Sequence, residues 1–439
     1  MNVTVENLAP CKRLVRVELE AQAVDAAFDR LTADFQKQAR LPGFRPGKAP
    51  KHLVLKAYTR EIEEEAKRKL ISDSYRKALD EQKLRVVGYP DIEEIQFGRG
   101  QALQFAATIE IAPDFELPDY KGIPVKREIA AVTDADVDRA INTLRDQRAS
   151  YNDVDRAVEA GDFVVVNYKG TSEGKPLTDF APAARGLTEK SGFWLHIEEN
   201  SFIPGFTTQL IGAKAGEKRA VNVKFPDDFV APQLAGKEGN YEVEITQVKV
   251  KVLPELNDEF AKSFGANDLD HLRTGVRSDL ENELGFKQKR AVRDQLVKSL
   301  LERVTCELPE SVVMNETRSV VYDIVRENQQ RGVPKEMLDE QKDQIFSFAN
   351  NSAKDRVKAA FIISRVADKE NIRVDDREVT QRVLFLAERN QIKPEKFVKQ
   401  LQERNGIAQI RDELLNAKVL DFLELNAKVE DALPNPTPA

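Results

Sequence analysis

The chain has 439 residues, of which 32% are charged, and its formal net charge is −7 at pH 7. This length predicts roughly three domains, and the acidic balance disfavours general nucleic-acid binding, so any RNA contact should be local. No apolar run approaches a membrane span, and the first residues lack the basic and apolar regions of a signal peptide. We therefore expect a cytoplasmic protein that makes no membrane contact.

The residue spacing gives little support for a metal site or a nucleotide-binding site. Cys11 and Cys306 are far apart and form no C-x-x-C pair, and the three histidines, His52, His196 and His271, are isolated. This argues against a disulfide framework or a zinc site, so we expect no metal. No G-x-x-x-x-G-K-[ST] sequence occurs, so no energy source of the P-loop type is predicted, and we expect no cofactor.

Residues 1–112 are predicted to form an α+β domain. Apolar residues alternate from Val15 to Leu19 as in a half-buried strand, and the apolar spacing from Val24 to Phe35 predicts a helix that ends at Leu41-Pro42. A second long helix is predicted from Val54 to about residue 84. Residues 91–97 and 103–111 then form two strands that pair across the turn at residues 98–100.

The loop between the two predicted helices is Gly43-Phe44-Arg45-Pro46-Gly47-Lys48-Ala49-Pro50. Its prolines and glycines predict a rigid turn that exposes an aromatic ring and two cations. From Phe35 to Arg60 the chain has no acidic residue and seven basic ones, which are Lys37, Arg40, Arg45, Lys48, Lys51, Lys56 and Arg60. Such a loop either docks on structured RNA or an acidic protein groove, or is an ordinary basic connection between helices.

The next two segments differ in composition. Residues 113–160 are predicted to be an extended, proline-punctuated linker with one helix, for which Thr133 and Asp136 make a plausible N-cap. Residues 161–250 are rich in strands and turns, with a short helical patch after Pro204-Gly205-Phe206, and are predicted to form a compact antiparallel β domain. Its aromatic residues either line a site or are plain core.

Residues 251–432 are predicted to form an all-helical domain, with breaks at Leu308-Pro309, Gly332-Val333-Pro334 and Lys393-Pro394. Apolar side chains on separate arms would suit a cradle for unfolded chains, but an ordinary helical bundle has the same periodicity. The proline-rich tail, residues 433–439, is predicted to be disordered. The fold class expected for the whole chain is multidomain α+β.

Two sets of motifs resemble known families. Gly-Phe-Arg-x-Gly-Lys-x-Pro at residues 43–50 is similar to the ribosome-binding signature of trigger factor, a family of ribosome-associated bacterial chaperones. Residues 161–250 resemble an FKBP-type peptidyl-prolyl isomerase in the segments 166–170, 202–206 and 212–217 and in the closing strand from Tyr241. The order of basic α+β domain, linker, FKBP-like insert and helical domain is that of trigger factor, so the resemblance covers nearly the whole chain.

The resemblance implies two sites. The ribosome-docking site is Gly43, Phe44, Arg45, Pro46, Gly47 and Lys48, which would bind the large ribosomal subunit near the tunnel exit, on ribosomal protein and rRNA. The proline pocket would be lined by Tyr168, Phe193, Leu195, Phe202, Ile203, Phe206, Phe229 and Tyr241. The family usually has an aromatic residue followed by an acidic one where this chain has Leu177-Thr178, so we expect reduced activity on short peptides. We also expect the fluorescence of Trp194, beside Phe193 in sequence, to report peptide binding.

The implied function is that of an ATP-independent, ribosome-associated chaperone. It would bind nascent and unfolded polypeptides, keep them open for folding or export, and isomerise X-Pro bonds. It would be cytoplasmic and partly ribosome-bound, with homodimerisation off the ribosome left open. The alternatives are a freestanding isomerase with tethering domains and no ribosome docking, and a periplasmic chaperone-isomerase, against which the lack of a signal peptide weighs.

Overall fold

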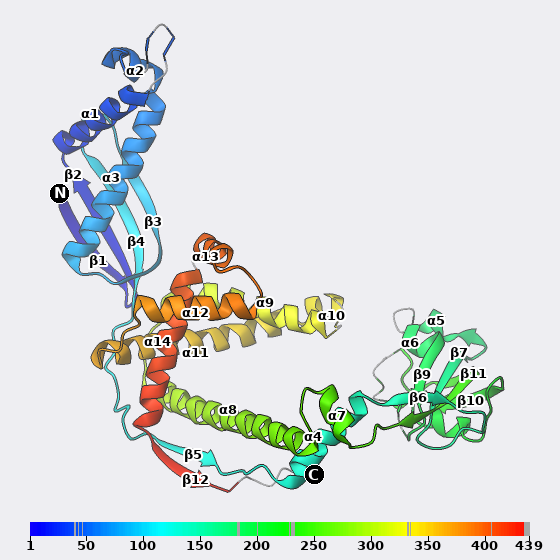
Figure 1. Cartoon of the computed structure of the whole chain (residues 1–439). Helices are drawn as coiled ribbons and strands as arrows, with labels where there is room; N and C mark the ends of the chain where they lie inside the picture. The colour runs from blue at the N-terminus through cyan, green and yellow to red at the C-terminus, as the bar shows by residue number, and fades with distance from the viewer. Residues whose placement is uncertain are drawn as a thin grey trace. The chain divides into compact units, whose positions relative to one another are not determined.

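The computed structural model describes residues 1–38, 41–42, 44–45, 47–181, 185–199, 201–227, 229, 233–331, 333, 335–404 and 406–433. The chain forms two compact units, one made of Met1–Ile129 with Gln288–Ala439 and the other of Ala130–Lys287 (Figure 1). Part of the break predicted at residues 332–334 and most of the tail predicted to be disordered lie outside the described residues. No helix among the described residues is long and apolar enough to cross a membrane.

The first unit begins with a four-stranded antiparallel sheet in the order β1-β2-β4-β3. Its strands are β1 (Asn2–Ala9), β2 (Lys12–Leu19), β3 (Val86–Gln96) and β4 (Leu103–Ile111). Helices α1 (Ala21–Gln38), α2 (Lys51–Ala57) and α3 (Thr59–Gln82) follow β2, and α1 and α3 cover one face of the sheet (Figure 1). The core between them includes Val15, Val17, Phe28, Ile62 and Phe105. The predicted pairing of residues 91–97 with 103–111 is confirmed by β3 and β4, but β3 begins earlier than predicted, at Val86.

Two expectations for this region are corrected. Strand β1 was not predicted, although Val3 and Val5 alternate with polar residues and pack against the core. The single helix predicted from Val54 is wrong, because α2 and α3 are separated at Tyr58, whose φ of −122° and ψ of 29° leave the helical region. The Tyr58 ring packs 6.1 Å from the Phe35 ring, so tertiary contact stabilises the break.

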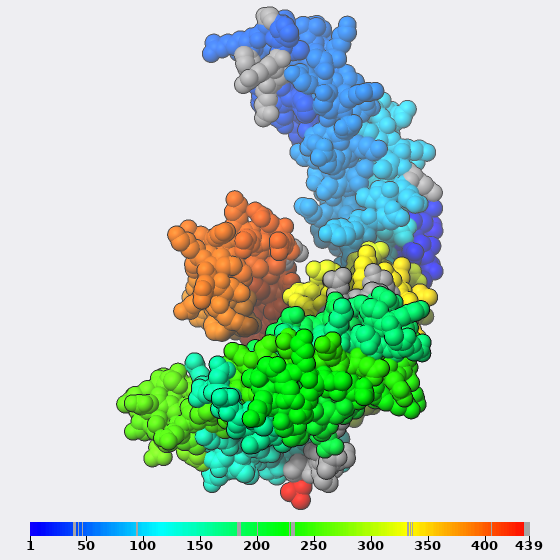
Figure 2. Space-filling model, turned by 90° about the vertical axis from the view of Figure 1, so that its right-hand side faces the viewer, coloured from blue at the N-terminus to red at the C-terminus, as the bar shows by residue number. Residues whose placement is uncertain are grey.

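The rest of the first unit is helical, with α9 (Glu310–Gln330), α10 (Lys335–Glu340), α11 (Lys342–Lys369), α12 (Asp376–Arg389), α13 (Pro394–Glu403) and α14 (Gly406–Leu425). A core of α8 (Leu269–Arg303), α11 and α14 residues includes Leu296, Val366 and Leu423. A second small core joins α12 and α14 through Val383 and Ile410. The surface of α12 and α13 is orange in Figure 2. One strand was unexpected: β12 (Lys428–Ala432) pairs in parallel with β5 (Pro124–Glu128) of the linker.

The second unit contains a six-stranded antiparallel sheet. Its elements in order are α4 (Asp134–Gln147), β6 (Ser150–Asp153), β7 (Phe163–Ser172), β8 (Lys175–Pro176), α5 (Leu177–Phe180), α6 (Arg185–Thr188), β9 (Glu189–His196), η1 (Thr207–Leu210), β10 (Lys218–Lys224), β11 (Glu238–Val252) and α7 (Asp258–Ser263). Helix α8 (Leu269–Arg303) starts in this unit and ends in the other. The predicted N-cap is confirmed, because Thr133 and Asp136 form a capping box at the start of α4.

Candidate functional site

The described residues of the basic loop are arranged as an exposed tip. Phe44 is 41% exposed, and Arg45 and Lys48 are exposed beside it. The Phe44 N–H donates to the Leu41 carbonyl at 3.1 Å and the Lys48 N–H to the Arg45 carbonyl at 3.0 Å, so the loop makes two tight turns. Gly47 has a φ of 83°, a conformation that glycine adopts without strain. Gly43 and Pro46 lie outside the described residues.

The base of the loop is fixed to the helices. Ala49 and Val54 are fully buried and pack with Phe35 and Tyr58. The Gln36 Nε2 of α1 donates to the Ala49 carbonyl at 2.7 Å. A fixed base holds the tip in one shape, which reduces the conformational entropy that the tip loses on binding.

The basic stretch from Phe35 to Arg60 has no acidic residue in sequence, but acidic residues lie close to it in space. Lys37 pairs with Asp34 at 2.9 Å and Lys51 pairs with Asp29 at 3.0 Å. The hydrogen bonds from these lysines lower the pKa of both carboxyls. Asp29 also binds Arg99 of the β3–β4 turn at 3.0 Å. Lys37 and Lys51 are thus partly neutralised by acidic neighbours, and Arg45 and Lys48 at the tip are exposed.

The second candidate site is a set of packed aromatic rings, which we call the aromatic cluster: Tyr168 of β7, Phe193 of β9, Phe202, Phe206 and Tyr241 of β11. Ring centroids lie 5.6 Å apart for Tyr168 and Phe193, 5.1 Å for Phe202 and Phe206, and 5.2 Å for Phe206 and Tyr241. Most of these pairs are T-shaped or tilted, the geometry that aromatic quadrupoles favour. Residues far apart in sequence thus meet in one place.

Most of the pocket residues named from the resemblance are deeply buried. Phe206 and Ile203 are 0% exposed, Tyr241 is 1% and Tyr168 is 4% exposed, while Phe193 and Phe202 are half-buried. Leu195 is buried in the same core. Phe229 is also half-buried in it, with its ring 4.9 Å from the Phe225 ring. The structure therefore brings the predicted residues into one apolar core.

Two tyrosine hydroxyls of the aromatic cluster donate to backbone carbonyls of α6. The Tyr168 Oη donates to the Gly186 carbonyl, and the Tyr241 Oη donates to the Leu187 carbonyl at 2.8 Å. Burial raises the pKa of Tyr168 to about 12 and also raises the pKa of Tyr241. Both hydroxyls therefore keep their protons at neutral pH and act as donors.

At the departure Leu177-Thr178, the leucine side chain is part of the core. Leu177 is fully buried in the same core as the aromatic cluster. A Cβ at Gly170 would lie 2.5 Å from Leu177 Cδ1 and 2.7 Å from Tyr241 Cε1, so only glycine fits there. Phe180 is half-buried against the core, and Lys237 Nζ lies 4.1 Å from its ring centroid. Phe180 thus adds an aromatic ring to the side chains that pack on this core.

Trp194 points away from the aromatic cluster. It is 48% exposed and packs against Tyr151 with ring centroids 5.4 Å apart, while Lys249 Nζ lies 5.3 Å from its ring. Phe193 contacts Tyr168, because successive residues of a strand face opposite sides of the sheet. Trp194 therefore faces the side of the sheet opposite to Phe193, and the report of peptide binding by its fluorescence stays a prediction.

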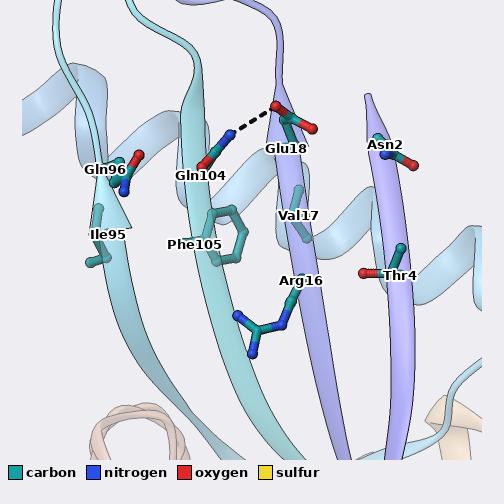
Figure 3. A pocket seen from close by; sticks show the side chains of 9 residues that line it. All are labelled: Asn2, Thr4, Arg16, Val17, Glu18, Ile95, Gln96, Gln104 and Phe105. Carbon is teal, nitrogen blue, oxygen red and sulfur yellow. Dashed lines mark hydrogen bonds between the residues drawn. The ribbon is translucent and has the colours of Figure 1, made fainter.

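Two further clefts belong to the first unit. One of about 590 Å³ lies on the open face of the four-stranded sheet, where Arg16, Glu18 and Gln104 project and Gln104 donates to Glu18 at 2.8 Å (Figure 3). The other, of about 750 Å³, lies beside α9 and α11, and Val312 and Phe361 are among its lining residues. The exposed apolar side chains of α9, α10 and α11 include Tyr322, Met337, Phe346 and Phe348. Sequence reasoning identified neither cleft.

Comparisons with known proteins match nearly the whole chain. The family model described as bacterial trigger factor protein matches residues 1–144, its C-terminus model matches residues 268–424, and the model for FKBP-type peptidyl-prolyl cis-trans isomerase matches residues 154–248. The chain is 34% identical to trigger factor of Opitutus terrae over 99% of this chain and 100% of that one. It is 32% identical to trigger factor of Geobacter metallireducens over 98% and 99% of the two chains.

A solved structure from work on substrate recognition by the trigger factor chaperone is also similar. It is 20% identical to this chain, covers 97% of it and 99% of its own length, and has a TM-score of 0.45.

Proposed function

The chain belongs to the trigger factor family, and from this premise we propose that it docks near the tunnel exit of the large ribosomal subunit through residues 43–48. It is a ribosome-associated chaperone with an FKBP-type peptidyl-prolyl isomerase domain, and nascent chains are its clients. We further propose a cytoplasmic location, and homodimerisation off the ribosome. The freestanding isomerase is not favoured, because trigger factor models match both sides of the FKBP-type region.

The proposed docking element rests on one observation, the exposed Phe44, Arg45 and Lys48 on a buried base. Replacing all three by alanine should abolish co-sedimentation with purified ribosomes and leave the fold intact. Docking of the unchanged protein should weaken with salt, because cations that bind rRNA release counterions. A matched control replaces Lys37 and Lys51, which already pair with acidic residues, and should sediment nearly as before. Sedimentation of the triple variant with ribosomes would refute the assignment.

We propose that the aromatic cluster, with Ile203 and Phe229, is the isomerase site and that it acts by desolvation. Rotation about a peptide bond faces a barrier of about 18–20 kcal/mol, because resonance stabilises the planar amide. The planar amide is more charge-separated than the twisted one, so an apolar site disfavours it more. This is preferential binding of the transition state, with no acid, base or covalent step. By resemblance, the Ile203 backbone N–H would hold a substrate carbonyl.

Activity measurements on full-length variants test this site. Phe206→Ala should lower isomerase activity at least tenfold, which is about 1.4 kcal/mol of barrier, without changing ribosome docking. Phe206→Leu keeps much of the buried volume and separates loss of the ring from loss of the fold. Activity that survives both Phe206→Ala and Tyr241→Ala would show that the site lies elsewhere.

We propose that the helical part of the first unit holds unfolded chains without ATP. Exposed Tyr322 of α9 and Phe346 and Phe348 of α11 are apolar contacts of the kind such a surface needs. Aggregation of a denatured client should be suppressed without nucleotide. A protein that lacks residues 161–250 but keeps the remaining fold should still suppress it. Loss of suppression with that deletion would contradict this part of the proposal.

A further inference from the structure

The aromatic cluster is covered by a short segment of its own chain, residues Gly186–Thr188 of α6, which we call the covering segment. Helix α6 lies against β7 and β9, the strands that carry Tyr168 and Phe193 (Figure 1). Leu187 packs against the core that contains the aromatic cluster, and Thr188 is fully buried. Gly186 is exposed on the outer side.

The covering segment binds the cluster as a peptide would. Its Gly186 and Leu187 carbonyls accept hydrogen bonds from the Tyr168 and Tyr241 hydroxyls. These carbonyls are chemically the same as those of any substrate backbone. The apolar contact comes from Leu187, whose side chain is half-buried.

A proline ring cannot reach the floor of this site while the arrangement persists. Phe206 and Ile203 have no exposed surface, and the two hydroxyls already have acceptors. Burial of a new ring against Phe206 therefore requires that an existing occupant leave. The two α6 carbonyls accept from the hydroxyls of the rings that pack on Phe206, and Leu187 lies against the same core, so these are the groups that a peptide could replace.

We infer that Leu187 determines substrate preference by occupying the isomerase site as an internal competitor of the prolyl peptide. This inference rests on the proposed location of the isomerase site. The apparent dissociation constant of a peptide equals its intrinsic value divided by the fraction of molecules whose site is not occupied by the segment. A short peptide must displace the segment from free solution. A long unfolded chain that the same molecule already holds competes at a high effective concentration and is favoured.

The covering segment is suited to displacement. It is a four-residue helix, so few backbone hydrogen bonds hold it in shape. A prolyl peptide that replaces it offers equivalent carbonyls to the tyrosine hydroxyls, so no buried donor is left unsatisfied during exchange. Replacement of the covering segment by a peptide alters the apparent affinity for substrate. It leaves the barrier to rotation unchanged once the substrate is bound.

Leu187→Ala in the full-length protein tests the inference directly. With a short Leu-Pro peptide, kcat/KM should rise at least fivefold through a lower KM, with kcat unchanged. With a long unfolded protein whose refolding is limited by prolyl isomerisation, kcat/KM should change less than twofold. Leu253→Ala, the same substitution at an exposed site after β11, should change neither value. An unchanged or lower kcat/KM for the short peptide would overturn the inference.

Hydrogen exchange on the unchanged protein gives a test that does not depend on a variant folding. Saturating Leu-Pro peptide should speed the exchange of the Gly186, Leu187 and Thr188 amides, because the segment is displaced. Slower or unchanged exchange would overturn the inference. Phe206→Leu separates the two proposals: if it keeps full activity, the isomerase site is misplaced, whereas if it loses activity and Leu187→Ala gains none, only the role of Leu187 is wrong.

Discussion

Phe206→Ala should strongly destabilise the FKBP-type domain as well as its activity. The Phe206 ring has no exposed surface and contacts the rings of Phe202 and Tyr241. Removal of a fully buried phenylalanine side chain costs about 3–5 kcal/mol, because transfer and cavity terms add. In a domain of roughly a hundred residues, each kcal/mol shifts the melting temperature by about 4–8 °C. The expected decrease is therefore about 12–40 °C.

Trp194 provides the assay for this prediction. It is the only tryptophan of the chain and lies in β9, so its fluorescence during heating reports the unfolding of its own domain within the full-length protein. Phe206→Leu leaves a smaller cavity than Phe206→Ala and should therefore cost less. The activity of each variant must be measured below its own melting temperature.

A small effect would refute the reasoning. If Phe206→Ala lowers the stability of the domain by less than about 1 kcal/mol, the ring is not enclosed in solution. The site would then be open, and the covering segment could not act as a competitor. The packing predicts that Phe206→Ala has a large effect on stability and that Phe206→Leu has a moderate effect on activity.

Four further outcomes follow from single contacts. Gln36→Met should weaken ribosome binding about two- to tenfold, because the hydrogen bond to the Ala49 carbonyl is lost. The slope of affinity against salt in co-sedimentation should stay the same, because no cation is removed. Arg156→Met should destabilise the FKBP-type domain by about 1.5–3 kcal/mol in Trp194 melts, because the buried Asp162 carboxylate loses bonds of 2.7 and 2.8 Å, and adding Asp162→Asn should recover part of the loss. Tyr168→Phe should remove a component near pH 12 from the tyrosinate absorbance titration, because the pKa of Tyr168 is raised to about 12 from 10.0. The stability that this shift contributes is fully present below pH 10.0 and is lost as pH rises through 12. Tyr322→Ser with Phe348→Ser should weaken suppression of client aggregation at least twofold, whereas Leu8→Ser, a change of another exposed apolar residue on β1, should not.

The proposed docking loop, residues 43–50, shows which part of a site can be read from residue types. Proline, glycine, aromatic and basic residues at fixed spacing specify a tight exposed turn, and the hydrogen bonds at Phe44 and Lys48 agree with that prediction. The charge around the loop was harder to predict. Asp34 pairs with Lys37 three residues later in α1, whereas Asp29 reaches Lys51 because α1 packs beside α2. A count of charges along the chain cannot detect the second kind of neighbour.

Contacts between distant segments were likewise invisible in the spacing. The Cys11 thiol donates to the Glu307 carbonyl at 3.2 Å, beside Cys306, although the two cysteines are remote in sequence. Burial is the main cause that raises the pKa of both thiols, so they are poor nucleophiles and behave as small packing residues. The Glu110 carboxylate accepts from the Ser311 N–H at 3.0 Å at the start of α9. These contacts join the strand end of the first unit to its helices.

The aromatic cluster shows the limit of motif reasoning at a binding site. Tyr168, Phe206 and Tyr241 could be predicted to lie together, because the matching segments fix which strands are neighbours. Whether the site is open could not be predicted, because its cover is a four-residue helix, too short to show periodicity. The cover also binds through backbone carbonyls, which every residue carries, so no residue type marks the contact. Leu187 contributes a side chain to the contact, but a single leucine near a tight turn is common and does not predict such a contact. The residues that line a site can therefore be read from a sequence before the residues that control access to it.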